Sequence, residues 1–314
     1  MDNIKIFANA TDYAAAGMPA SESRVALIEN VNQVKYDGVN VEVSMPTPGD
    51  YVYRDADGNI HFIKKATVRT AVIPSGWVFI DVFYFGWKDE MFVDMGSGIL
   101  WGKCDIDVTK SNKMCDTPFT YQKSFFSWGN IEGHNPVNNT FANVYNWGSV
   151  NAQEPWYEDQ PYGDTPGAAL SGDIAPDSGY DATRENLGGT KRMPTNAEYG
   201  TLFNNIDYIT EDGEIVTAAT SIAKTAADKR VYVNGIAGLY IRSKINGNRL
   251  FFACSGYGAG TSWYNRGSGG YYWSSSFNSA HYARDLNFSS GGVHPQGNSY
   301  RYYGFAVRPV QNIV

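Results

Sequence analysis

Residues 254–310 read CSGYGAGTSWYNRGSGGYYWSSSFNSAHYARDLNFSSGGVHPQGNSYRYYGFAVRPV, and the interpretation of the whole chain starts from them. After Lys244 the chain has no Lys, Glu or Met, although about a quarter of the residues in ordinary domains are Asp, Glu, Lys or Arg. Tyr supplies a large amphipathic contact area with few rotatable bonds, and Ser, Gly and Asn supply adaptable hydrogen bonds. This composition predicts a ligand-recognition surface rather than a reaction centre.

Apolar residues at alternate positions distinguish the scaffold of this stretch from its displayed residues. Leu286 and Phe288 alternate with Asp285 and Asn287, so a strand here would bury the first pair and display the second. The same two-residue alternation across residues 303–310 places Phe305, Val307 and Pro309 on one side of a strand. Core and turn positions are expected at Gly267, Gly269, Gly270 and Trp273.

The first 90 residues predict a small, mostly β domain, because a chain of 314 residues is long enough for two domains. Strands are expected at residues 24–28 and 77–84. Two hairpins are expected around the turn signals Asp37-Gly38 and Asp57-Gly58.

A second domain is expected from residue 91 to residue 314, beginning with a strand at Trp101. Residues 130–182 are rich in Asn, Pro, Gly and Asp and lack periodicity, which is typical of a long irregular insertion. Thr195 and Glu198 form a capping box that predicts the start of a short helix. Two further strands are expected on either side of a turn at Asn246-Gly247. The predicted fold class is therefore α+β and β-rich.

Net charge and hydropathy exclude two classes of partner. The formal net charge is -7, the pI is near 5.1 and no basic run is present, whereas a phosphate-binding surface needs clustered Lys and Arg. No apolar stretch reaches the length of about 18 residues that a membrane helix requires. We predict neither nucleic-acid binding nor membrane insertion.

The opening sequence MDNIKIF lacks the charged and apolar regions of a signal peptide, so synthesis in a cytoplasm is expected. In that compartment the three cysteines would be thiols, with a Cys104–Cys115 disulfide as the alternative.

Enzyme and metal motifs are absent from the sequence. It has no Walker loop, no His-Glu-x-x-His, no Cys-x-x-Cys and no Gly-x-Ser-x-Gly. His281 and His294 lie within the Tyr-rich stretch, where a contact role fits better than metal ligation. Calcium takes about six to eight oxygen ligands, and Asp285 is the only carboxylate side chain after residue 245. We predict a protein that is not an enzyme and uses no cofactor or metal.

Four blocks of sequence, in a fixed order, resemble one family. They are VDMGSGILW at 93–101, FFSWG at 125–129, NLGGTKRMPTNAE at 186–198, and a terminal block with YYWSSS at 271–276, LNF at 286–288 and GFAVRPV at 304–310. This series is similar to the Fibrobacter-type major paralogous domain, which resembles the C-type-lectin fold used by variable proteins of diversity-generating retroelements. The resemblance implies that residues 91–314 are a C-type-lectin-like domain with long irregular insertions.

In retroelement-diversified members, adenine-directed mutation reaches codons for residues such as Asn, Tyr, Ser, His, Asp and Arg, but not Lys, Glu, Met, Gln or Trp. The missing Lys, Glu and Met fit that restriction, and Trp263, Trp273 and Gln296 would be fixed positions. The resemblance implies a variable region at about 257–310 whose ligand-binding residues are Tyr264, Asn265, Tyr271, Asn278, Ser279, His281, Tyr282, Arg284, Asp285, Asn287, His294, Asn298, Ser299, Tyr300, Tyr302 and Tyr303. The alternative is a Tyr-rich β-surface that is simply well packed.

Parts of the first 90 residues resemble the start of structural proteins of tailed phages of gut Bacteroidales. These parts are YAAA at 13–16, ESRVAL at 22–27 and VKYDGVNV at 34–41. The resemblance implies that residues 1–90 attach or oligomerise the second domain on a tail fibre or baseplate. A generic β accessory domain is the alternative.

Together the resemblances imply a receptor-binding protein of a phage tail tip, made in the host cytoplasm and carried in the virion. Its partners would be a bacterial surface protein or glycan, other tail proteins, and copies of itself, with a homotrimer favoured. The alternative is a bacterial surface adhesin or pilus-tip protein at the cell surface. A third reading, an enzyme on the same fold, would need a cleft with perturbed polar groups.

Overall fold

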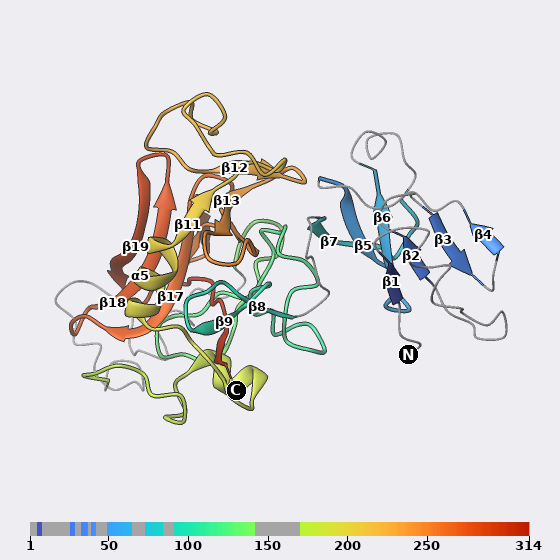
Figure 1. Ribbon diagram of the computed structural model, residues 1–314. Helices are drawn as coiled ribbons and strands as arrows, with labels where there is room; N and C mark the ends of the chain where they lie inside the picture. Colours follow the sequence, from blue (N-terminus) through green and yellow to red (C-terminus); the bar gives the residue numbers. More distant parts are fainter. Residues whose placement is uncertain are drawn as a thin grey trace.

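The computed structural model describes residues 49–64, 73–83, 91–141 and 170–313, together with the backbone of four strands before residue 49. Figure 1 shows strands before and after residue 91, and the helices among the described residues, at 182–187 and 196–204, are short. The strands form several small sheets in which nearly all neighbours are antiparallel. This content confirms the predicted β-rich α+β class.

The first sheet has the strand order β1 (Lys5–Phe7), β2 (Ala26–Ile28), β3 (Gln33–Tyr36), β4 (Val39–Val41). β2 lies within the strand predicted at 24–28. β3 and β4 pair antiparallel across residues 37 and 38, so the first predicted hairpin is confirmed.

The second sheet has the order β6 (Ile60–Ile63), β5 (Tyr51–Arg54), β7 (Val78–Val82). β5 and β6 pair antiparallel, and Gly58 in the turn between them has a φ of 91°, a conformation that glycine adopts readily. The second predicted hairpin is therefore confirmed, as is the strand predicted at 77–84.

Aromatic rings join this second sheet to residues that follow position 91. The ring centroids of Phe79 and Phe119 are 4.6 Å apart, and those of Phe119 and Phe251 are 4.9 Å apart. The Tyr51 hydroxyl donates a hydrogen bond of 2.7 Å to Glu211. The sheet thus shares a hydrophobic core with the later chain, and the domain boundary at residue 90 stays a prediction.

A third sheet joins the two ends of the remaining chain. Its order is β10 (Lys191–Arg192), β20 (Val310–Asn312), β9 (Ile99–Gly102), β8 (Phe92–Asp94). The C-terminal strand β20 pairs antiparallel with β9, so that Val310 lies opposite Trp101. Residues 92–312, which we call the body, therefore begin and end in the same sheet.

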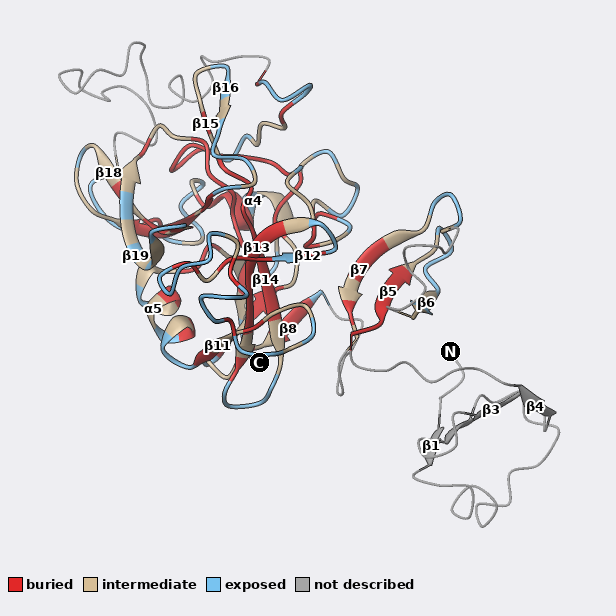
Figure 2. Ribbon diagram, turned by 90° about the horizontal axis from the view of Figure 1, so that it is seen from above, coloured by how far each residue is buried: buried red, intermediate tan, exposed pale blue. Residues whose placement is uncertain are grey.

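The most buried strands of the body belong to a fourth sheet. β13 (Ile236–Ser243) pairs with β11 (Ile206–Tyr208), β12 (Val231–Val233) and β14 (Arg249–Ala253). Gly247, with a φ of 78°, lies in the turn between β13 and β14 at the predicted position. Figure 2 shows both of these strands as almost wholly buried in the middle of the body.

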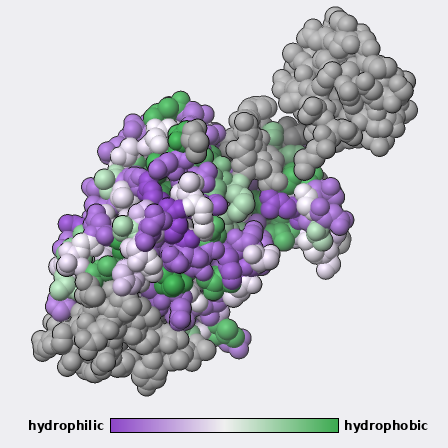
Figure 3. Space-filling view, turned by 90° about the horizontal axis from the view of Figure 1, so that it is seen from below, coloured by the Kyte–Doolittle hydropathy of each residue, from purple (hydrophilic) through white to green (hydrophobic). Residues whose placement is uncertain are grey.

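The last sheet contains the Tyr-rich stretch. Its order is β17 (Gly270–Phe277), β18 (Tyr282–Ser289), β19 (Gly292–Tyr300), which places β19 at the edge. A small hairpin of β15 (Tyr257–Ala259) and β16 (Ser262–Tyr264) precedes it along the chain. On the face of the molecule seen in Figure 3, hydrophobic residues lie in small groups among hydrophilic ones.

Each helix among the described residues begins at a capping residue. Asp181 accepts hydrogen bonds from two backbone N–H groups at the start of α4 (Ala182–Leu187). Thr195 and Glu198 form the predicted capping box at the start of α5 (Asn196–Asn204). α5 packs against the β17–β19 sheet and buries its apolar side chains in the main core.

The main core also contains the residues of β18 that the alternation placed inside. Leu286 and Phe288 are fully buried there, beside Trp101 and Phe252. All three cysteines are free, which confirms the predicted thiol state over the alternative disulfide.

Asp105, Lys123 and Arg308 form a buried ion cluster that links three distant segments of the body. Arg308 Nε donates to one carboxylate oxygen of Asp105 at 2.5 Å, and Lys123 Nζ donates to the other. The rest of the Arg308 guanidinium donates to the carbonyls of Gly102, Lys103 and Phe251. Burial by itself would raise the pKa of Asp105, but the two cations outweigh it and hold this pKa below its ordinary value.

We expect Asp105→Ala to lower the free energy of unfolding by about 3–5 kcal/mol, because the variant leaves two buried cations without a counterion. Urea unfolding at pH 7 measures the difference. Asp116→Ala is the matched control, since Asp116 pairs with Lys110 at the surface and such pairs contribute about 0–1 kcal/mol. Equal losses in the two variants would contradict the role given to the buried cluster.

Candidate functional site

The Tyr-rich stretch forms a surface over the β15–β16 hairpin, the β17–β19 sheet and the turn that follows β19. The expected scaffold residues Trp273, Phe305 and Val307 are buried. Tyr264 has 47% of its area exposed, and the other tyrosines of the predicted set are partly exposed. Aromatic side chains are thus available to a partner on a framework that is fixed beneath them.

Seven tyrosine rings are in continuous contact on this surface, and we call them the tyrosine face: Tyr257, Tyr264, Tyr271, Tyr282, Tyr300, Tyr302 and Tyr303. Ring centroids are 4.9 Å apart for Tyr257 and Tyr303, and 5.2 Å apart for Tyr300 and Tyr302. At the two ends, Tyr264 lies 5.3 Å from Tyr257 and Tyr282 lies 4.5 Å from Tyr300. Because each ring supports the next, a partner that binds here would immobilise few additional rotamers.

Tyr257 is the centre of this network, and the sequence-based set of site residues omitted it. It contacts Tyr264, Tyr271 and Tyr303 as well as Phe305. Burial, helped by the neighbouring phenols, raises the pKa of Tyr257 to about 12, so its hydroxyl remains neutral at physiological pH. The missed signal was the two-residue turn Gly260-Thr261, because such a hairpin places Tyr257 opposite Tyr264.

The cross-strand register divides the predicted site residues between two sides of the β17–β19 sheet, since directly paired residues share a side. One side carries Tyr271, Asp285, Asn287, His294 and Ser299. The other side carries Tyr282, Arg284, Asn298 and Tyr300. Tyr302 and Tyr303, in the turn after β19, connect the two groups through ring contacts. The tyrosine face therefore includes residues from both sides of the sheet.

Four other predicted site residues lie in loops at the ends of this surface. Asn278, Ser279 and His281 belong to the connection between β17 and β18 and are partly exposed. The backbone N–H of Ser279 donates to the Tyr282 carbonyl at 2.9 Å. Asn265, after β16, is exposed and donates from its side-chain amide to the Tyr271 hydroxyl at 2.8 Å. The structure thus places these four residues next to the tyrosine face.

Asp285 is fully buried, so the prediction that it is displayed beside Asn287 is wrong. The alternation of apolar and polar residues correctly predicts the side of the strand that Asp285 faces, but neighbouring residues cover its carboxylate there. This carboxylate accepts hydrogen bonds from Ser299 Oγ at 2.7 Å and from Asn287 Nδ2 at 3.2 Å. The pairing of β18 with β19 also shifts between Asp285 and Asn287, and such a bulge redirects side chains locally. Alternation alone could not reveal that shift.

Burial raises the pKa of Asp285 to about 6, and the hydrogen bonds from Ser299 and Asn287 oppose this shift only in part. Because this pKa lies above the ordinary value of 3.8, the folded state holds the proton more tightly than the unfolded state does. The stabilising contribution is complete below about pH 4 and is lost as the pH rises through about 6. Ionised Asp285 therefore lowers the stability of the fold near neutral pH.

We expect Asp285→Asn to exceed the wild-type chain in free energy of unfolding by about 2–3 kcal/mol at pH 7.5. The difference should shrink below about 1 kcal/mol at pH 4.5, where the wild-type carboxyl is protonated in the folded state. Urea unfolding of both proteins at pH 4.5, 6.0 and 7.5 measures this trend. A difference that stays constant with pH would show that the carboxyl does not titrate in this range.

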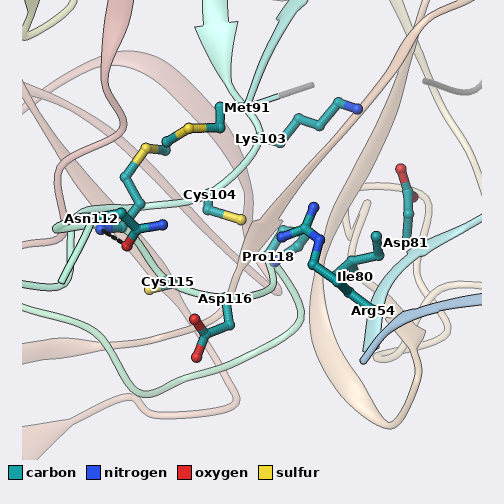
Figure 4. Close-up of a pocket in the computed structure, with 11 residues that line it drawn as sticks. Arg54, Ile80, Asp81, Met91, Lys103, Cys104, Asn112, Cys115, Asp116 and Pro118 are labelled. Atoms are coloured by element: carbon teal, nitrogen blue, oxygen red, sulfur yellow. Dashed lines mark hydrogen bonds between the residues drawn. The ribbon is translucent and has the colours of Figure 1, made fainter. Parts of the chain in front are cut away.

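A separate cavity of about 70 Å³ lies between the second sheet and the body (Figure 4). Its lining includes Arg54, Asp116 and both thiols of Cys104 and Cys115. Burial raises the pKa of Cys104 to about 12 and that of Cys115 well above its ordinary value. Since the thiolate is the reactive form of cysteine, both groups are poor nucleophiles here. No residue of the tyrosine face lines this cavity.

Comparisons of the chain with protein-family models, curated proteins and solved structures gave no match. Within residues 49–64, 73–83, 91–141 and 170–313, no three His, Cys, Asp or Glu side chains are grouped so that they could hold a metal ion. None of the helices that the structure describes is long and apolar enough to cross a membrane.

Proposed function

We propose that this chain is a receptor-binding protein of a phage tail tip, whose lectin-like body presents the tyrosine face to a ligand on a bacterial cell surface. The single observation that carries the proposal is the continuous contact of seven tyrosine rings, all from a stretch of sequence without Lys, Glu or Met. Rigid aromatic anchors among Ser, Gly and Asn are the composition that recognition loops use. Residues 1–90 would attach the body to other tail proteins.

Contacts between the sequence blocks that resemble the lectin-like family support this assignment of the body. The FFSWG block and the YYWSSS block are joined by two hydrogen bonds of 2.8 Å: Trp128 Nε1 donates to the Ser274 carbonyl, and Trp273 Nε1 donates to the Phe126 carbonyl. The first block forms β8 and β9, which the end of the terminal block joins through β20. β10, from the block at 186–198, also pairs with β20, so the four blocks contact one another through shared sheets and hydrogen bonds.

The separation of scaffold from surface supports diversification of the contact residues. Trp273 and Leu286 are fully buried, whereas Tyr264, Asn265 and His294 are exposed. Substitutions at exposed positions usually change stability by less than about 0.5 kcal/mol, while removal of a large buried side chain costs about 2–5 kcal/mol. A population of variants could therefore differ in ligand and keep one fold.

Repetition of the site would compensate for modest affinity. A dozen exposed or partly exposed side chains can cover roughly 600–800 Å² on one partner, which is the lower range of specific interfaces. Linking several copies raises the apparent affinity through effective concentration, by about 10²–10⁴-fold where geometry permits. A homotrimer on the tail would supply those copies.

We expect the fluorescently labelled chain to bind intact cells of at least one strain in a bacterial panel, measured by flow cytometry across protein concentrations. The double variant Tyr264→Ser with Tyr302→Ser should raise the apparent Kd by about ten-fold or more, because loss of an aromatic hot spot costs about 2 kcal/mol. Tyr232→Ser is the matched control, since Tyr232 on β12 is 57% exposed and lies outside the tyrosine face.

The control variant should bind like the wild-type chain. Unchanged binding by the double variant, or an equal loss in Tyr232→Ser, would contradict recognition through the tyrosine face. A panel in which no strain binds the wild-type chain would count against the receptor-binding proposal itself.

A further inference from the structure

A buried carboxyl without a cationic partner lies in the middle of the candidate binding sheet. Asp285 is the only acidic residue of β17, β18 and β19, and no ion pair of the described residues includes it. Its two oxygens are held by neutral donors, the Ser299 hydroxyl and the Asn287 amide. Both donors belong to the set of residues predicted to contact the ligand.

The backbone leaves space for this arrangement at one position. Gly297 of β19 pairs with Asp285, and a Cβ added at Gly297 would lie 2.2 Å from Asn287 Nδ2 and 2.5 Å from Asp285 Oδ1. Any other residue at position 297 would therefore displace the two side chains. Asn287 in turn pairs with Tyr271 of the tyrosine face, so the orientation of its amide affects what a partner meets there.

A carboxylate that lowers stability at neutral pH and lies beneath a recognition surface is a candidate for a functional role. We propose that Asp285 is a proton-sensitive positioning residue, whose carboxylate holds the Asn287 amide and the Ser299 hydroxyl in the orientation that the bound partner requires. This inference rests on the proposed function of the tyrosine face.

Protonation changes the number of acceptors that the side chain offers. An ionised carboxylate accepts both hydrogen bonds at once, whereas a protonated carboxyl has one O–H that must donate. Either Asn287 or Ser299 then loses its acceptor and reorients. Because burial places the pKa of Asp285 near 6, ligand binding should be strong at pH 7.5 and weaker at pH 5.0, opposite in direction to the stability of the fold.

Few other titratable groups surround Asp285. Tyr271 on β17 and Tyr199 on α5 have pKa values raised by burial and remain neutral below pH 9. Arg284, the neighbour of Asp285 in β18, points to the other side of the sheet, but its positive charge still lowers the pKa of Asp285. His294 on β19 lies on the same side of the sheet as Asp285. The variant His294→Asn therefore accompanies each measurement.

The first test measures the hydrogen bonds around Asp285 directly and needs no binding partner. In the ¹⁵N-labelled full chain, the side-chain amide signals of Asn287 should shift between pH 4.5 and 8 with a midpoint near 6. We expect the shift to disappear in Asp285→Asn and to persist in His294→Asn. Ser299→Ala should move the midpoint to higher pH, because it removes a hydrogen bond that lowers the pKa of Asp285. An Asn287 amide that does not titrate in the wild-type chain overturns the inference.

The second test reads binding, with intact cells of a strain that the wild-type chain binds as the probe. The apparent Kd of the wild-type chain should be about five-fold or more higher at pH 5.0 than at pH 7.5, as expected when a hydrogen bond worth about 1 kcal/mol is lost. Asp285→Asn should show no such change. Tyr232→Ser, which lies outside the tyrosine face, should show the same pH dependence as the wild-type chain.

The two tests separate this inference from the function on which it rests. Binding by the wild-type chain that does not vary with pH overturns the role of Asp285, while loss of binding by Tyr264→Ser with Tyr302→Ser would still support the tyrosine face. If the apparent Kd still changes with pH in Asp285→Asn but no longer changes in His294→Asn, the inference is overturned and the pH dependence belongs to His294. If no strain binds, the function fails and the binding role of Asp285 fails with it, whatever the amide titration shows.

Discussion

The carboxylate of Asp105, buried between two cations, ties together segments of the body that are far apart in sequence. Its partner Arg308 precedes β20 and also donates to three backbone carbonyls, with its guanidinium 4.5 Å from the ring centroid of Phe252. The position of Arg308 fixes where β20 meets β9. It also fixes the preceding residues 302–307, which carry Tyr302, Tyr303 and the ring of Phe305 beneath them. The geometry of the tyrosine face thus depends on an ion cluster that no ligand would touch.

Asp105 and Asp285 show how partners decide the effect of burial on a carboxyl group. Both are fully buried, and in both burial raises the pKa. At Asp105 the two cations lower the pKa by more than burial raises it. At Asp285 the two neutral donors lower the pKa by less than burial raises it. The first carboxylate is therefore a permanent anion that holds the scaffold. The second changes its charge near neutral pH, within reach of residues that a ligand would contact.

Local features of this fold could be predicted because the signal and its consequence lie a few residues apart. Turn residues located the hairpins around Gly58 and Gly247, a capping box located α5, and alternation buried Leu286 and Phe288. Features that depend on contacts between distant segments could not be predicted in the same way. No local pattern pairs Asp105 with a residue 203 positions later, and none shows that the second sheet packs on the body through aromatic rings.

The same limit applies to the candidate site. Composition identified the Tyr-rich stretch as a surface, and the structure places its tyrosines in contact. The alternation of apolar and polar residues predicted that Asp285 is exposed, whereas it is buried. Alternation along a strand indicates which side of the sheet a side chain faces, but not whether neighbouring residues cover it. Tyr257 was missed because its importance comes from rings that reach it from β16, β17 and the turn after β19.

The closure of the body by β20 has a practical consequence for handling the protein. Figure 2 shows the C-terminal end and the β15–β16 hairpin at opposite ends of the body. An affinity tag, a dye or a linker to a sensor chip joined after Val314 would therefore project away from the aromatic surface. Immobilisation through that terminus should leave the surface open to bacterial extracts, so captured molecules could be identified by mass spectrometry.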